Sequence, residues 1–233
     1  NMLKNLNLEK LLFFDIETVS NKASYSELSP SMQELWQHKH QYIAKQEEEF
    51  ASSYSNRAAI YSEYGKIVCI SCGFLVNNEL RIKSFANVNE AKILQDFSTL
   101  LLDNHFTLCG HNIKEFDVPY VCRRLLINGL KLPPVLDIAG KKPWEVDYID
   151  TLQLWKFGDF KHYTSLNLLA NIFDIPSPKD DIDGSQVGKV FWEDKDLSRI
   201  IEYCQKDVLT LARLVQKWKG DSLLKDEHVS VIA

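Results

Sequence analysis

Residues 11–18, LLFFDIET, decide the fold, because a short apolar run is followed at once by two acids, Asp15 and Glu17. Such a run is typical of a buried strand. Side chains alternate across a strand, so Asp15 and Glu17 project from one face while Ile16 points to the other. Taken alone, this pattern also fits a strand that leaves the core with two solvated acids, whereas two neighbouring carboxylates favour a bound cation.

The elements around this strand follow from periodicity and turn residues. Asn77 and Asn78 form a hairpin signal between two β-rich stretches, which predicts an antiparallel pair of strands. The stretches with helical periodicity then alternate with short apolar runs, which predicts parallel crossovers. The predicted elements are strands 66–76, 80–85, 106–110 and 146–151, and helices 89–101, 118–128, 165–173 and 196–219.

Together these elements predict an α/β fold with a mixed five-stranded sheet and helices on both faces, which is the ribonuclease H-like plan. We expect residues 1–233 to form a single domain, as their number and apolar content allow. Residues 20–63 are polar and contain a charged helix after Pro30, so we interpret them as an inserted helical segment between two strands. Residues 220–233 are expected to form a C-terminal tail.

Composition narrows the class of protein. A net charge of −5 argues against binding nucleic acid through a broad basic surface, so a polyanion must be held locally or through metal. The five cysteines are odd in number and lie in apolar segments, which predicts buried, reduced thiols; we expect Cys69 and Cys72 to pack in the core. No apolar run approaches the length of a membrane span, which predicts a soluble, cytoplasmic protein.

Two further polar groups occur next to apolar stripes. Tyr203 and Asp207 are four residues apart on the last long helix and therefore share one of its faces. Phe116 and Asp117 lie where residues 109–124 pass from a strand into a helix. Each feature has an ordinary alternative, since a half-buried tyrosine beside an acid one turn away is common in helices.

In combination, the residues resemble a known family. FDIET at 14–18, HNIKEFDVP at 111–119 and YCQKDV at 203–208 are similar, in order and context, to the three motifs of the DEDD (DnaQ-like) exonucleases. The spacing of Tyr203 and Asp207 resembles the DEDDy branch. The second motif is most similar to the proofreading exonuclease domain of family B DNA polymerases. The similarity spans residues 12–219, and the short stretch after Gly220 leads us to expect a free-standing member.

This resemblance implies a 3′-5′ exonuclease that hydrolyses phosphodiester bonds with two divalent cations, Mg²⁺ or Mn²⁺, as carboxylate ligands favour. It implies that Asp15 bridges both cations, Asp207 holds the one that activates water, and Asp117 holds the one at the leaving group. Glu17 and Tyr203 would orient the nucleophile. A tyrosine hydroxyl ordinarily titrates near pH ~10, so positioning is the expected role of Tyr203 rather than that of a base.

The expected substrate is the 3′ end of a single-stranded nucleic acid, with DNA favoured over RNA, and a DNA polymerase or repair complex is a possible partner. Thr18, Asn112 and Phe116 are the candidate substrate contacts, although Phe116 fits core packing equally well. Lys179 is a weaker candidate for a phosphate contact. Two alternatives remain open: an RNA exonuclease similar to ribonuclease D, and a non-catalytic module that binds nucleic acid or a polymerase.

Two acids near the predicted strand 146–151, Asp147 and Asp150, fall outside the three motifs. We expect them to cap or to face solvent, and the alternative is that they support the metal ligands from behind.

Overall fold

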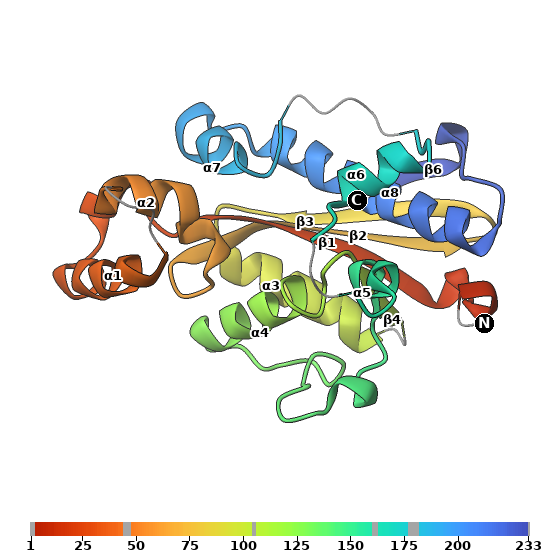
Figure 1. The fold of residues 1–233 in the computed structure, drawn as a ribbon, viewed down its shortest axis with the longest axis horizontal. Helices are drawn as coiled ribbons and strands as arrows, with labels where there is room; N and C mark the ends of the chain where they lie inside the picture. The colour runs from red at the N-terminus through yellow and green to blue at the C-terminus, as the bar shows by residue number, and fades with distance from the viewer. Residues whose placement is uncertain (1–2, 44–47, 104–105, 160–162, 177–181, 233) are drawn as a thin grey trace.

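The first strand, β1 (Leu11–Ser20), runs through the middle of a mixed sheet (Figure 1). The computed structural model describes residues 3–43, 48–103, 106–159, 163–176 and 182–232. Within these residues the sheet has six strands in the order β5-β4-β1-β2-β3-β6. The other strands are β2 (Gly65–Val76), β3 (Glu79–Ala86), β4 (Thr107–Gly110), β5 (Ile149–Asp150) and β6 (Val229–Ile232).

The predicted meander is confirmed, because β1, β2 and β3 pair antiparallel in sequence. Asn77 and Asn78 make the turn between β2 and β3, both with positive φ, a conformation that asparagine tolerates well. β4 runs parallel to β1, and β5 parallel to β4, as the predicted crossovers require. The α/β class is therefore as predicted.

The predicted number of five strands is wrong. Val229–Ile232, within the stretch expected to be a tail, forms β6 and pairs in parallel with Leu80–Lys83 of β3. This strand is four residues long and only partly buried. Its formation depends on the edge that β3 offers rather than on a strong pattern of its own.

Helices cover the two faces of the sheet separately (Figure 1). α3 and α4 pack on one face against Leu12, Phe14 and Ile16, while α8 packs on the other face against Phe13. The helices of these two layers and of the connections are α3 (Glu90–Asp103), α4 (Asp117–Ile127), α5 (Thr151–Lys156), α6 (Leu166–Ile172), α7 (Val187–Lys189), the π-helical turn η6 (Val190–Asp194) and α8 (Leu197–Lys219). Short 3₁₀ turns are η1 (Leu3–Asn5), η2 (Leu8–Lys10), η3 (Tyr25–Glu27), η4 (Ala58–Ile60), η5 (Pro143–Glu145) and η7 (Asp226–His228).

The connection from β1 to β2 folds into α1 (Pro30–Ile43), α2 (Phe50–Arg57) and η4, at the end of the sheet where β1 stops (Figure 1). α1 was predicted and α2 was not. Trp36 and Tyr54 are fully buried between these helices, with ring centroids 5.2 Å apart. The connection therefore has an apolar core of its own.

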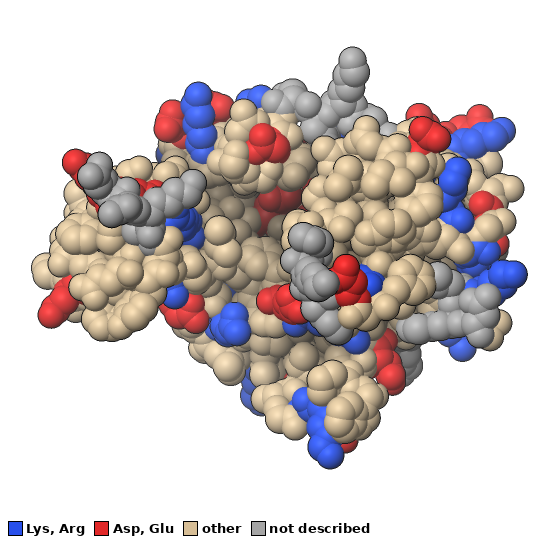
Figure 2. Space-filling view, viewed as in Figure 1, with Lys and Arg blue, Asp and Glu red and all other residues tan. Residues whose placement is uncertain are grey.

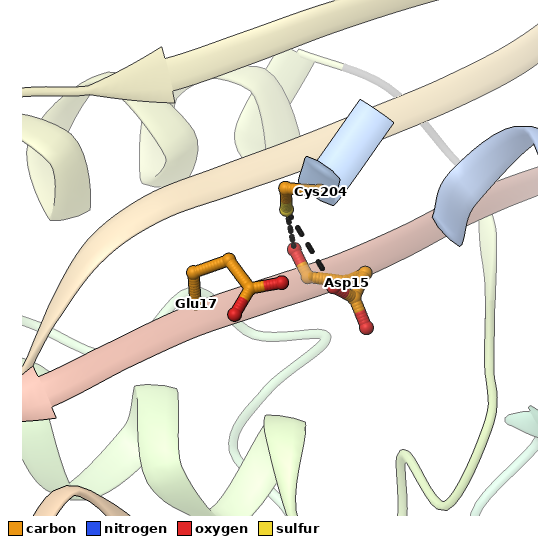
Figure 3. A group of neighbouring side chains, drawn as sticks. All are labelled: Asp15, Glu17 and Cys204. Carbon is orange, nitrogen blue, oxygen red and sulfur yellow. Dashed lines mark hydrogen bonds between the residues drawn. The ribbon is translucent and has the colours of Figure 1, made fainter. Parts of the chain in front are cut away.

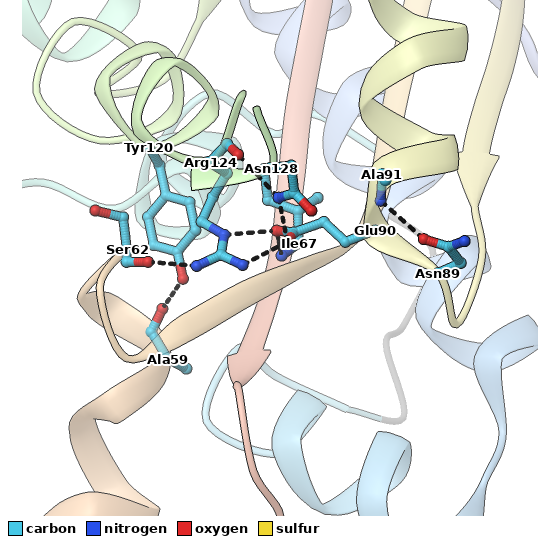
Figure 4. A network of polar contacts seen from close by, with 9 residues as sticks. All are labelled: Ala59, Ser62, Ile67, Asn89, Glu90, Ala91, Tyr120, Arg124 and Asn128. Atoms are coloured by element: carbon cyan, nitrogen blue, oxygen red, sulfur yellow. Dashed lines mark hydrogen bonds and ion pairs between the residues drawn. The ribbon is translucent and has the colours of Figure 1, made fainter. Parts of the chain in front are cut away.

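A buried polar network joins this connection to the rest of the protein (Figure 4). Arg124 on α4 forms an ion pair with Glu90 on α3 and donates a hydrogen bond to the carbonyl oxygen of Ser62 at 2.9 Å. Tyr120 and Thr18 both donate to the carbonyl oxygen of Ala59, each at 2.9 Å. These contacts fix the inserted helices against β1 and α4.

The five cysteines are free thiols, four of them buried and Cys122 half-buried, as predicted. Cys72 lies in the core beneath α3 and α4, and Cys69 on the side of α8, so the CxxC pair is divided between the two faces. In the described part of the chain, no helix combines the length and apolar character that a membrane span requires.

Candidate functional site

Asp15 and Glu17 project from the same side of β1, toward α8 (Figure 3). Ile16 between them packs on the opposite side, in the core beneath α3 and α4. Glu17 is buried, with 7% of its surface exposed, and Asp15 is half-buried. A bulge in the pairing with β2 follows directly after Glu17. β1 therefore delivers both carboxylates to one place and then bends away toward the inserted helices.

α8 contacts β1 at Asp15. The thiol of Cys204 lies 3.5 Å from Oδ2 of Asp15 and 3.5 Å from its backbone oxygen. Potential ligand atoms of Asp15, Glu17 and Cys204 all lie within 4.8 Å of one another, the dimensions of a cation site (Figure 3). Asp207 and Asp117 are not part of this tightest group, although both act on Asp15 electrostatically.

Tyr203 lies one residue before Cys204 and is half-buried against the cluster that contains Val19 and Phe191. Its hydroxyl stands 4.0 Å from the position that a Cβ on Gly184 would take. The loop before α7 therefore passes beside the Tyr203 hydroxyl.

Asp117 is the first residue of α4 and only 4% exposed. The turn before it begins with Asn112 in the left-handed conformation, at φ +64°. The buried carboxylate of Asp150 accepts hydrogen bonds from the backbone N–H groups of Asn112 and Lys114, each at 3.1 Å. The same carboxylate caps α5, as predicted, by accepting from the N–H groups of Leu152 and Gln153. Asp150 thus clamps the turn that presents Asp117.

Burial and mutual repulsion act on these carboxylates together. Burial raises the pKa of Asp15 well above its ordinary value, and the charges of Asp207 and Asp117 raise it further. Burial likewise raises the pKa of Glu17, with Asp15 and Asp207 next in effect. Burial raises the pKa of Asp117 to about 7, while hydrogen bonds with backbone groups, including that of Ile16, oppose the rise. Asp117 therefore reaches the part of β1 that carries the other two acids.

This clustering of carboxylates destabilises the folded protein when no cation is bound, and it favours the binding of a cation. Several carboxylates in a space of low dielectric constant cannot all ionise unless positive charge is present. Carboxylate oxygens are the ligands that Mg²⁺ and Mn²⁺ prefer. The donor set therefore fits divalent cations. A hollow with acidic side chains at its bottom opens over the middle of β1 in Figure 2.

The candidate substrate contacts have different surroundings. The Thr18 hydroxyl donates to Ala59 and so anchors the inserted segment. Asn112 is half-buried in the turn before α4. Phe116 is half-buried, packs against the core beneath α4, and lies 5.5 Å from the ring of Tyr120, which agrees with the packing alternative. Lys179 lies outside the described residues.

Sequence reasoning missed three side chains at this site. Cys204 was assigned to the apolar stripe of α8, and its place three residues before Asp207 is the signal that could have placed it beside the acids. His111 and Tyr163 meet with ring centroids 6.1 Å apart, although they are far apart in the sequence. No spacing rule links these two rings.

Comparisons with known proteins identify a family and a similar fold. A family described as "Predicted 3'-5' exonuclease related to the exonuclease domain of PolB" matches residues 57–215. Among solved structures, the family B DNA polymerase from the hyperthermophilic archaeon Pyrobaculum calidifontis is similar in fold, with a TM-score of 0.53 and 16% sequence identity. That similarity covers 90% of this chain and 27% of the polymerase. No curated protein matches the chain.

Proposed function

This chain belongs to the family of predicted 3′-5′ exonucleases related to the exonuclease domain of PolB, and on that premise we propose that it removes nucleotides from the 3′ end of single-stranded nucleic acid, preferably DNA, with two divalent cations. The observation that carries the proposal is the mutual effect of the acids. Burial raises the pKa of the half-buried Asp15, and the charges of Asp207 and Asp117 raise it further. A protein gains nothing in stability from such a cluster, whereas cation binding and phosphate chemistry require it.

In this proposal Asp15, Glu17, Asp117 and Asp207 hold Mg²⁺ or Mn²⁺. The cations would supply positive charge for the scissile phosphate and make a water molecule more acidic. Asp15 has Glu17 beside it on β1, and the charges of Asp207 on α8 and Asp117 on α4 also act on it, so Asp15 would contribute to holding the cations together with all three. Cys204, with its thiol against the Asp15 carboxylate, holds that side chain in its direction.

Tyr203 would position the attacking water through its hydroxyl. Its ring packs in the cluster with Val19 and Phe191, so the side chain is held from one side and its hydroxyl is directed toward the loop at Gly184. Positioning by a hydrogen bond needs no change in charge on the tyrosine. Asn112 and Phe116, on the turn that leads to Asp117, are the proposed contacts of the terminal nucleotide, and Thr18 supports the inserted segment through Ala59.

The test is release of mononucleotides from labelled single-stranded DNA and RNA of the same sequence, with Mg²⁺, Mn²⁺ or EDTA. We expect cation-dependent release from the 3′ end, faster on DNA. Asp15→Asn should reduce release to the level in EDTA, because a cation ligand is lost. Tyr203→Phe should keep cation affinity and slow release roughly 10- to 100-fold, the usual effect of removing a group that orients a metal site.

Asp137→Asn is the matched control, since Asp137 is an exposed acid that is not among the main groups acting on Asp15, Glu17 or Asp117. It should release nucleotides like the wild type. Absence of release from both polymers would contradict the proposal, as would full activity of Asp15→Asn. A faster reaction on RNA would overturn the DNA preference alone.

A further inference from the structure

Tyr163 presents an aromatic ring to solvent at a place where nothing so far explains it. Tyr163 is 66% exposed, yet it lies close to the start of α6, two residues before the N-cap Ser165, and contacts His111. An exposed aromatic side chain is not unusual by itself, and Tyr42, Trp144 and Phe157 are at least as exposed. Tyr163 differs from these side chains in the contacts that hold it and in its place in the fold.

The ring of Tyr163 is held in place by His111. The two ring centroids of Tyr163 and His111 lie 6.1 Å apart, with the planes at 73°. Both nitrogens of His111 are occupied: Nε2 donates to the carbonyl oxygen of Thr164 at 2.8 Å, and Nδ1 lies 2.9 Å from the hydroxyl of Thr151. Thr164 is the residue next to Tyr163, so the imidazole fixes both the ring and the backbone beside it.

The position is beside the carboxylates. β4 runs parallel to β1 and pairs with it up to Phe13 and Cys109, so Asp15 and His111 both follow the paired stretch, with His111 at the start of the turn between β4 and α4. The Tyr163 ring that contacts His111 therefore lies beside the turn that presents Asp117. The surroundings agree: partial burial of the Tyr163 hydroxyl raises its pKa, and the charges of Asp117 and Asp15 raise it further.

Such a ring fits one class of ligand. Proteins that bind single strands stack bases on aromatic side chains, because every base has a π-face. The bases nearest to an acidic hydrolytic site belong to the two nucleotides on either side of the bond that is cut. An aromatic ring that is held beside the site offers a stacking surface to one of these two bases. Because the ring is already held, binding costs little side-chain entropy.

We propose that Tyr163, held by His111, is the stacking platform for the base of one of the two nucleotides that flank the scissile phosphate. This proposal rests on the proposed exonuclease function. It assigns substrate positioning to a residue between the second and third motifs, on the side of the site formed by α5 and α6.

The experiment measures binding of single-stranded oligonucleotides by fluorescence anisotropy with Ca²⁺, and kcat and KM for nucleotide release with Mg²⁺. The variants are Tyr163→Ala, Tyr163→Phe and the control Trp144→Ala, which removes another exposed aromatic side chain. The oligonucleotides carry all bases, or lack one base at the terminal, the penultimate or the fifth position from the 3′ end. Thermal unfolding of each variant checks that it folds.

We expect Tyr163→Ala to weaken binding of the complete oligonucleotide roughly 5- to 100-fold, the usual effect of losing one stacked base. The loss should vanish when the terminal or the penultimate base is missing and persist when the fifth is missing. Tyr163→Phe should bind like the wild type, since the ring does the stacking, and Trp144→Ala should change nothing.

Unchanged binding by Tyr163→Ala would overturn the proposal, and so would an equal loss on all oligonucleotides. An effect of Tyr163→Phe equal to that of Tyr163→Ala would overturn it too, because the hydroxyl would then be responsible. A wild-type protein that binds strands through Tyr163 without hydrolysing them would contradict the exonuclease function and leave the stacking role in place. Hydrolysis by the wild type, together with no effect of Tyr163→Ala on binding, would support the exonuclease function and overturn the stacking role.

Discussion

The carboxylate of Glu90 is 8% exposed and satisfied entirely by protein groups (Figure 4). It accepts from the N–H group of Ile67 at 2.7 Å, from Arg124 through both oxygens, and from the amide of Asn128 at 2.9 Å. A buried ion pair of this kind adds little net stability compared with apolar residues, but removal of one partner leaves an uncompensated charge. Its conspicuous effect is to join α3, α4 and the loop at Ser62 in one geometry.

We therefore expect Glu90→Gln to lower the free energy of unfolding by about 3 kcal/mol or more, because Arg124 would remain charged and buried without its partner. Denaturation in urea measures the change. Asp96→Asn is the control, since it breaks the exposed pair between Lys92 and Asp96 and should cost less than about 1 kcal/mol. Equal losses in the free energy of unfolding for the two substitutions would show that removing a partner from the buried pair costs no more than breaking the exposed pair.

At the scale of elements, the turn before α4 depends on Asp150. Oδ1 of Asp150 accepts from Asn112, Leu152 and Gln153, while Oδ2 accepts from Lys114. Asn in place of Asp150 retains one oxygen, which can still cap α5, but places an amide donor against the N–H group of Lys114. Ala removes both functions. The two substitutions therefore separate the cap of α5 from the clamp on the turn that carries Asp117.

We expect Asp150→Asn to slow nucleotide release roughly 10- to 100-fold, because misplacing a group behind a metal ligand has effects of this size. Asp150→Ala should slow release similarly and in addition lower the stability by about 1 kcal/mol, the usual value of an N-cap. Single-turnover kinetics and thermal unfolding provide the two readouts. Wild-type rates in both variants would mean that the turn holds its shape without Asp150.

Elements with a strong local pattern were predictable from the sequence, and those that depend on distant contacts were not. The meander of β1 to β3 and the long helix α8 follow from alternation, an Asn-Asn turn and an apolar stripe. α2 has a Ser-rich sequence without helical periodicity, and it is stabilised by Tyr54 packing on Trp36. The predicted strand 146–151 shrinks to β5, because Asp150 ends it to cap α5.

The same distinction between local patterns and distant contacts applies to the candidate site. Asp15 and Glu17 were expected on one face of a strand, and the structure places them on one face. The contact of Cys204 with Asp15, and that of His111 with Tyr163, join segments that only the folded chain brings together. Their roles could not be read from spacing, because no local period relates such residues.

On the scale of the whole molecule, the inserted helices are not a loosely attached lobe. Tyr120, Thr18 and Arg124 reach into the connection between β1 and β2, and Trp192 from η6 donates to the backbone oxygen of Ser20, where β1 ends. Elements on both faces of the sheet, α4 on one and η6 on the other, thus hold the inserted segment.

The acids on β1 and at the start of α4 make the stability of the whole fold depend on pH and cations. Without a cation, Asp117 titrates at about 7 in the folded protein and near ~3.9 when unfolded. The folded state therefore retains a proton that the unfolded state releases, and stability falls as the pH rises between these values. Asp15 and Glu17 shift in the same direction. A divalent cation favours the ionised carboxylates and opposes the fall.

We accordingly expect the protein in EDTA to lose stability from pH 5 to pH 7, with Asp117 alone contributing on the order of 2 kcal/mol. Urea denaturation across this range, repeated with Mg²⁺ or Mn²⁺ in excess, measures both effects, and the cation should remove most of the slope. Asp117→Asn isolates the group, because an amide mimics the protonated acid: its slope in EDTA should be shallower and its stability at pH 7 higher than that of the wild type. Identical slopes for the two proteins would mean that Asp117 ionises freely in the folded state, and the acids at β1 and α4 would then not be coupled in the way that the proposed cation site requires.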